Sequence, residues 1–139
     1  MFHQAYPDIK VVQVGAKGFS RIEGCDTYAL GYDLEVAKYV LKDSLLHIDC
    51  EGGLVHLATQ LGTKCVVLFG QTPIKFYAYP DNINLSAGCC HNCYWLTNDF
   101  TTCYRGQSEP ECMRAITPEM VMEAVRRYLD TQGLDSKGQ

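Results

Sequence analysis

Short apolar runs bounded by glycine or turn residues recur through the first half of the chain. They predict buried strands at residues 10–15, 45–48 and 65–69, and the pattern allows a further short strand at 83–85. The glycine-punctuated stretch around Thr27 fits either a loop or a short strand.

Between these runs the apolar residues recur at helical spacing. Residues 33–43 and 54–61 each carry one apolar face, with Asp33 placed to cap the first helix and Gly62 to end the second. A last helix begins at Thr117-Pro118, a capping residue followed by a proline in the first turn. Strands that alternate with helices predict an α/β fold, with a parallel sheet covered on both faces.

Residues 74–115 break this pattern. They are rich in Tyr, Asn, Gly and Cys, and five of the eight cysteines fall between residues 89 and 112. A long irregular stretch in a compact domain is usually functional, or is held by something other than apolar packing. Without a secretion signal, clustered cysteines favour a metal site over a disulfide framework.

The spacing of these cysteines is that of a metal-binding finger, which we place at residues 88–113. A C-x-x-C pair chelates one tetrahedral ion from a single turn, and two later thiolates complete the site. The predicted ligands are Cys90, Cys93, Cys103 and Cys112. Four thiolates suit Zn or Fe. Cys89 and His91 are alternative donors, while two disulfides or simply buried thiols are the competing interpretations. The aromatic residues expected to pack beneath the finger are Tyr94, Trp95 and Phe100.

The turn at residues 49–53 has the features of a phosphate site. It follows a predicted strand and leads into a helix, where Gly52 and Gly53 lack Cβ atoms and leave their N–H groups open to a ligand. The helix start adds unpaired N–H donors and the positive end of the helix dipole, so a diphosphate fits. His56, one turn in, and Thr72, after the next strand, are placed to reach the same ligand. The alternative is a tight turn beside a core histidine.

Charge and composition exclude several classes of function. The 139 residues carry a net charge of -4 without a cluster of basic residues, which disfavours nucleic acid and anionic membranes as partners. The longest apolar run is too short to span a bilayer, and the N-terminus does not have the form of a signal peptide. We therefore expect a cytoplasmic chain with one domain over residues 1–131 and a flexible tail at 132–139.

The stretch from Ile48 to Ala58, continued through residues 61–64 and 66–72, resembles glycosyltransferase family nine, which contains the ADP-heptose:lipopolysaccharide heptosyltransferases. The donor-binding signature of that family has an acidic residue, small residues, an apolar pair and His, then a strand that ends in Phe-Gly-Pro-Thr. The resemblance covers about residues 8–130. It implies a Rossmann-like domain, the C-terminal half of a GT-B fold, with the cysteine finger as an irregular insertion.

The resemblance also implies which residues bind the donor: Glu51, Gly52, Gly53, His56, Thr72 and Tyr32. Glu51 matches the acid that contacts the sugar, the two glycines match the amides on the diphosphate, and Tyr32 falls near the nucleobase. Two positions depart from the family, because Gln71 replaces the usual Pro and Glu51 replaces the commoner Asp. Either departure can shift the choice of donor.

The implied function is donor binding in an inverting transferase that moves a sugar, expected to be heptose, from a nucleotide-diphosphate donor to a lipopolysaccharide or protein acceptor. The family's acceptor domain, which holds the general base, is missing from this chain, so we expect a fragment that is inactive alone. Relatives that heptosylate autotransporter proteins carry a similar cysteine insertion that binds iron, which favours iron by analogy. The alternative is a catalytically inactive, metal-stapled binding or homo-oligomerisation module. A redox module is a weaker alternative, since its C-x-x-C motif would open a helix after a strand.

Overall fold

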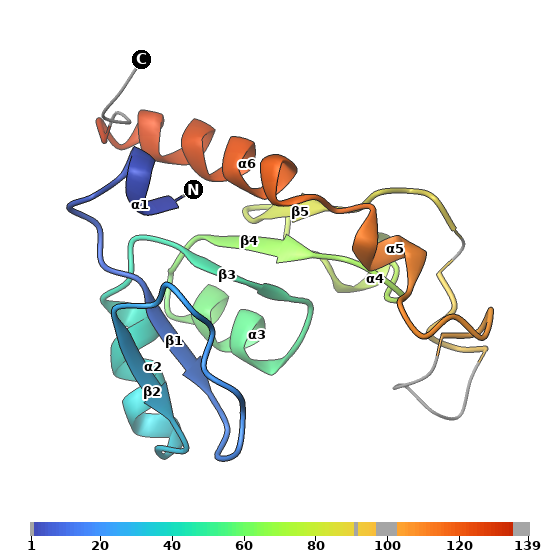
Figure 1. Ribbon diagram of the computed structural model, residues 1–139, viewed down its shortest axis with the longest axis horizontal. Coiled ribbons are helices and arrows are strands. Elements are labelled where there is room, and N and C mark those ends of the chain that lie inside the picture. Colours follow the sequence, from blue (N-terminus) through green and yellow to red (C-terminus); the bar gives the residue numbers. More distant parts are fainter. Residues whose placement is uncertain (1, 91, 97–102, 135–139) are drawn as a thin grey trace.

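The computed structural model describes residues 2–90, 92–96 and 103–134, and within them the chain alternates short strands with short helices (Figure 1). None of the helices in these ranges is long and apolar enough to cross a membrane. In chain order the elements are α1 (Phe2–Ala5), β1 (Val12–Gly15), β2 (Thr27–Leu30), α2 (Leu34–Lys42), β3 (His47–Cys50), α3 (Gly53–Gln60), β4 (Cys65–Leu68), α4 (Ile74–Tyr77), β5 (Ile83–Leu85), α5 (Glu111–Arg114) and α6 (Pro118–Thr131).

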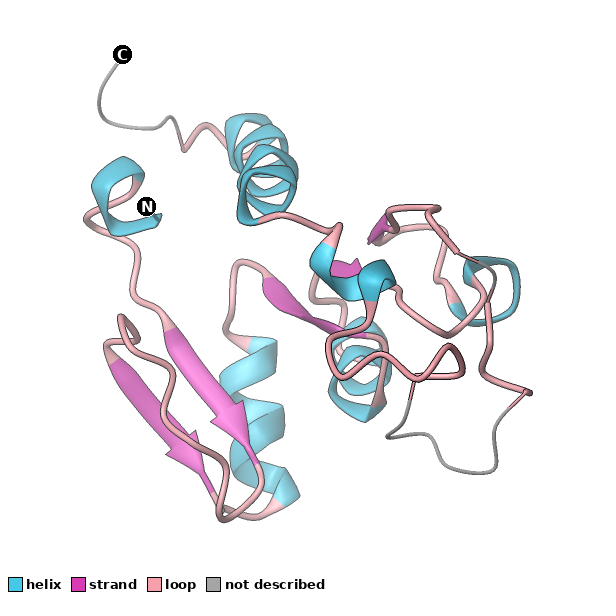
Figure 2. Ribbon diagram, turned by 45° about the vertical axis from the view of Figure 1, so that its right-hand side comes forward, coloured by secondary structure: helices cyan, strands magenta, loops and turns pink. Residues whose placement is uncertain are grey.

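The strands pair in parallel, as the alternation with helices predicts, so the α/β class is confirmed. They form two sheets, however, and the expectation of one continuous sheet is wrong for the described residues. β1 pairs with β2, while β3, β4 and β5 form a separate sheet in that order. Figure 2 shows the two-stranded sheet standing apart from the other. Val12 in β1 and Ile48 in β3 are both exposed, so the prediction that these two strands are buried is wrong at these positions.

The core lies on both faces of β4, the central strand of the larger sheet. Cys65 and Val67 pack on one side with residues of α2 and α3, and Val66 packs on the other side with residues of α6. Side chains alternate along a strand, which sends successive residues to opposite layers. This double burial explains why β4 reads as a continuous apolar run.

The helix ends lie where capping residues predict them. The Asp33 carboxylate accepts a hydrogen bond from the Val36 N–H at 3.1 Å at the start of α2. Gly62 follows α3 with φ +84°, a left-handed conformation that glycine adopts without strain. The strand expected at residues 45–48 lies two residues later, because its ladder with β4 begins at His47, opposite Cys65.

Replacing Thr117 by alanine should lower the free energy of unfolding by about 1 kcal/mol. The Thr117 hydroxyl accepts a hydrogen bond from the Met120 N–H at 3.3 Å and caps α6, whose apolar face covers the larger sheet. Urea denaturation measures the loss. Thr131→Ala is the matched control, since that hydroxyl bonds only within the last turn of the same helix and its neighbour Gln132. Equal losses in both variants would contradict the assignment of the cap.

Candidate functional site

The carboxyl ends of β3 and β4 meet at one edge of the larger sheet. The Glu51 N–H donates to the Leu68 carbonyl at 3.1 Å, which ties the turn after β3 to the end of β4. The segment that follows β4, Gly70 to Thr72, therefore leaves the sheet beside Glu51. Two segments that are twenty residues apart in sequence reach the same edge, as expected for parallel strands.

The N-terminus of α3 is open at this edge. Gly52 occupies the capping position with an extended backbone and supplies no side-chain cap. A Cβ atom at Gly53 would have no heavy atom within 4 Å, and one at Gly52 would meet only the Cys50 carbonyl at 3.8 Å. The first N–H groups of α3 thus keep space for an anion, which supports the expectation from the sequence.

His56 joins Glu51 in a short polar chain rather than entering the core. Its Nε2 lies 3.4 Å from Glu51 Oε1, and its Nδ1 lies 3.1 Å from the Tyr79 hydroxyl. The Glu51 side chain is 12% exposed and that of His56 is 43% exposed. The imidazole ring thus has Glu51 on its Nε2 side and Tyr79 on its Nδ1 side. Tyr79 was not identified from the sequence, because no local motif links it to His56.

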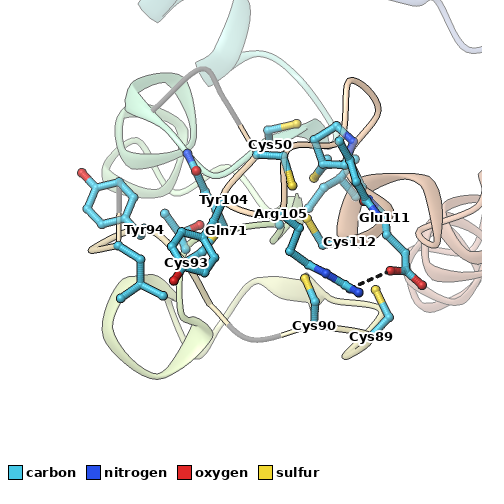
Figure 3. A pocket seen from close by; sticks show the side chains of 18 of the residues that line it. Cys50, Gln71, Cys89, Cys90, Cys93, Tyr94, Tyr104, Arg105, Glu111 and Cys112 are labelled. Carbon is cyan, nitrogen blue, oxygen red and sulfur yellow. Dashed lines mark hydrogen bonds and ion pairs between the residues drawn. The ribbon is translucent and has the colours of Figure 1, made fainter. Parts of the chain in front are cut away.

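A cavity of about 780 Å³ lies beyond this edge, with the finger forming its other wall (Figure 3). Its volume is in the range of small-molecule and cofactor sites. The strand ends contribute Glu51, Gln71 and Thr72 to its lining. The finger contributes all four predicted metal ligands, Cys90, Cys93, Cys103 and Cys112. From the sequence, the donor turn and the finger were predicted as two separate sites, whereas in the structure Glu51 of that turn lines the same cavity as the four cysteines.

The predicted donor residues are only partly brought together. Glu51 and Thr72 share the cavity with the finger, and Thr72 is largely buried there. Gly53 and Tyr32 instead line a second, larger cavity of about 1840 Å³ that is bordered by both sheets. Gly52 and His56 line neither cavity, although His56 contacts Glu51 directly. Four of the six predicted donor residues are therefore divided between two cavities.

Cys90 lies among the thiols of the finger, with Cys112, Cys89 and Cys93 as its neighbours. Burial, and after it the neighbouring Cys112, raises the pKa of Cys90. All eight cysteines are free thiols. Within the described ranges no three His, Cys, Asp or Glu side chains are grouped closely enough to hold a metal ion. The donor set fits Zn or Fe, and binding requires the thiols to move closer together.

Tyr94 anchors the first part of the finger to the larger sheet. Its N–H donates to the Gln71 carbonyl at 3.2 Å, and its ring stands edge-on to Tyr77 of α4, with centroids 5.6 Å apart. Burial, followed by the contact with Tyr94, raises the pKa of Tyr77. Trp95 packs edge-on against Tyr94 at 4.7 Å but stays exposed on its outer side. The expected packing of Tyr94 is thus confirmed, and Phe100 and His91 lie outside the described residues.

Gly70 anchors the last part of the finger. A Cβ atom at this position would lie 2.5 Å from Met113 Sδ and 3.5 Å from Cys112 Sγ. The Met113 side chain of α5 therefore packs closely on the loop after β4, and a larger residue at position 70 would force that side chain to shift. This contact holds Cys112 beside the strand ends, next to Glu51 and Thr72 in the cavity wall.

An ion pair on the finger completes the cavity wall. Arg105 and Glu111 both line the cavity, with Nη1 of the arginine 3.0 Å from Oε2 of the glutamate. Neither was singled out from the sequence. Their position was the available signal, because both lie between the predicted ligands Cys103 and Cys112.

Comparison of the chain with protein-family models, with curated proteins and with solved structures gives no match. The class that the fold defines is that of α/β proteins with small parallel sheets. A more specific assignment has to rest on the chemistry of the α3 N-terminus and of the cavity beside it.

Proposed function

We propose that this chain is the donor-binding domain of an inverting glycosyltransferase of family nine, and that it binds a nucleotide-diphosphate sugar at the start of α3. The observation that carries the proposal is the uncapped N-terminus of α3, open beside a carboxylate at the carboxyl edge of a parallel sheet. Anions bind at such helix starts, and ligands of α/β proteins bind at such edges.

Each donor residue has a role in this proposal. The N–H groups of Gly52 and Gly53 hold the diphosphate, and the Thr72 hydroxyl adds a donor from the neighbouring loop. Glu51 accepts hydrogen bonds from sugar hydroxyls, with its orientation fixed by His56 at 3.4 Å. Tyr32 stands on the other side of the α3 start, where it borders the second cavity and can flank the base.

The contribution of this domain to catalysis follows from the place where negative charge develops in the transition state. As the sugar leaves, negative charge grows on the diphosphate, and the amides and dipole of α3 stabilise that charge more strongly than they stabilise the ground state. The general base that activates the acceptor is assigned to an acceptor domain that acts as a partner of this one. The heptose donor, the lipopolysaccharide or protein acceptor and a cytoplasmic location belong to the same proposal.

The finger is proposed to hold one structural Zn or Fe ion through Cys90, Cys93, Cys103 and Cys112. Such an ion supplies folding free energy to a segment that has little apolar core of its own. The support is that all four cysteines line one cavity and that Cys90 has Cys112 and Cys93 as neighbours.

Replacing Glu51 by glutamine should weaken binding of a nucleotide sugar about tenfold, since a hydrogen bond to a charged group becomes a neutral one. Binding of the nucleoside diphosphate without sugar should be unchanged or tighter, because a negative charge near the phosphates is removed. Titration calorimetry with ADP-heptose and with ADP measures the two affinities. Glu35→Gln, an exposed acid of α2 paired with Lys38, is the matched control and should change neither value. Failure of the unmodified chain to bind any nucleoside diphosphate at millimolar concentration would refute the proposed function.

An assembly module is the second candidate, and the surface of the finger favours it. Trp95, Leu96 and Tyr104 are all exposed on the finger. Large apolar side chains grouped on a surface are typical of a contact with another protein. Size-exclusion chromatography with and without a chelator separates the two functions: an assembly module dissociates when the metal is removed, whereas a donor-binding domain keeps its mass.

A further inference from the structure

We propose that Arg105 of the finger binds the diphosphate of the donor from the wall of the 780 Å³ cavity, and that Glu111 competes with the ligand for Arg105. This inference rests on the proposed function and adds to it a residue outside the α3 turn. Its starting point is the charge balance of the cavity. Among the described residues that line it, Arg105 is the one cation, while Glu51 and Glu111 are acids.

A diphosphate is a multiply charged anion, and at the α3 start it would stand close to Glu51, which directly precedes Gly52 and lines this cavity. The α3 N-terminus offsets part of the repulsion, but its field is only that of a partial charge. A guanidinium group carries a full charge and five N–H donors in a planar fork, which suits phosphate oxygens. Arg105 is the side chain in the cavity wall that can neutralise the ligand.

The contact with Glu111 leaves the guanidinium group of Arg105 available to bind an anionic ligand. Nη1 of Arg105 bonds Glu111 Oε2 at 3.0 Å, and the two side chains are 56% and 49% exposed. Figure 3 shows the guanidinium extended along the cavity wall between Cys90 and Glu111. Ion pairs as exposed as this one contribute little to stability, so a ligand with more charge can displace the glutamate. Glu111 therefore pre-orients the arginine and competes with the anion.

The position of the pair on the chain adds a further reason. Arg105 lies two residues after Cys103, and Glu111 directly precedes Cys112. Both ends of the segment are thus predicted metal ligands, and Gly70 seats the Cys112 end against the strand edge. A segment held at both ends keeps its guanidinium within the cavity at low entropic cost.

Inorganic pyrophosphate is the direct probe, because it presents the diphosphate without base or sugar. Titration calorimetry on the metal-loaded chain should show that Arg105→Gln weakens pyrophosphate binding about tenfold, as loss of a charge-assisted hydrogen bond predicts. Glu111→Gln should tighten it a few-fold, because it removes the competing carboxylate. Arg114→Gln is the matched control: Arg114 is exposed at the end of α5, just after Cys112, but does not line the cavity, and the net charge changes equally.

The possible results separate this inference from the proposed function. The inference would be overturned if the pyrophosphate affinity of Arg105→Gln stayed within twofold of that of the unmodified chain, or if the Arg105 and Arg114 variants lost equal affinity. Either result would leave the proposed function standing. Absence of binding of both pyrophosphate and nucleoside diphosphates by the unmodified chain would overturn the proposed function itself. Metal content is measured in every variant, and loss of metal from Arg105→Gln would assign the arginine to the finger alone, against the inference.

Discussion

Replacing Cys112 by serine should remove the proposed metal ion from the finger and lower stability more than any other single substitution considered for this chain. Cys112 lines the same cavity as Cys90 and lies next to Gly70 at the start of α5. A structural zinc site contributes about 10 kcal/mol or more to small metal domains, and three remaining ligands bind far more weakly than four.

Elemental analysis of the purified protein measures the loss directly. We expect about one Zn or Fe ion per unmodified chain and substantially less in Cys112→Ser, with reduced resistance to urea. Cys25→Ser is the matched control, because Cys25 lies before β2 and outside the finger. The metal assignment would be wrong if the unmodified chain carried no ion after reconstitution, or if the Cys25 variant lost it equally.

Replacing Phe69 by alanine should cost about 3–5 kcal/mol of unfolding free energy. Phe69 is 1% exposed and packs with Leu41, Val55 and Val67 between the larger sheet and helices α2 and α3. Its removal leaves a cavity that the surrounding strands and helices can close only partly. The residue also directly precedes Gly70, so the loop that supports Thr72 and the finger loses its anchor.

Phe76→Ala provides the control for this loss. Phe76 has the same side chain on α4 but is 71% exposed, and it should change stability by less than about 0.5 kcal/mol. Urea denaturation of both variants, compared at equal metal loading, gives the two values. Similar losses for the two positions would show that the core is not centred on β4 as described.

Features set by local chemistry could be predicted from the sequence. Asp33 and Thr117 cap helices with their own side chains, and Gly62 ends a helix through its backbone conformation. For these caps and this helix end the determinant lies within four residues of the feature. The glycines of the turn at residues 52 and 53 could also be recognised, but a distant partner holds the turn in place, through the hydrogen bond from the Glu51 N–H to the Leu68 carbonyl.

Features set by distant partners could not be predicted. The shift of the third strand to His47–Cys50 depends on its register with β4, and the division into two sheets depends on pairings that no local pattern encodes. The environment of His56 depends on Tyr79, 23 residues away, within a stretch that has no periodicity. Arg105 lies in the same kind of stretch, and only the fold brings it into the wall of the cavity that Glu51 also lines.

The division of the described strands into two separate sheets also affects local unfolding of the molecule. Because no backbone hydrogen bonds join β1 to β3, the β1–β2 pair and the β3–β5 sheet can behave as separate cooperative units with different local free energies of opening. Gly53 and Tyr32 border the gap between these units. Relative motion of the two units would therefore change the space beside Gly53 and Tyr32 without breaking the backbone hydrogen bonds of the β3–β5 sheet.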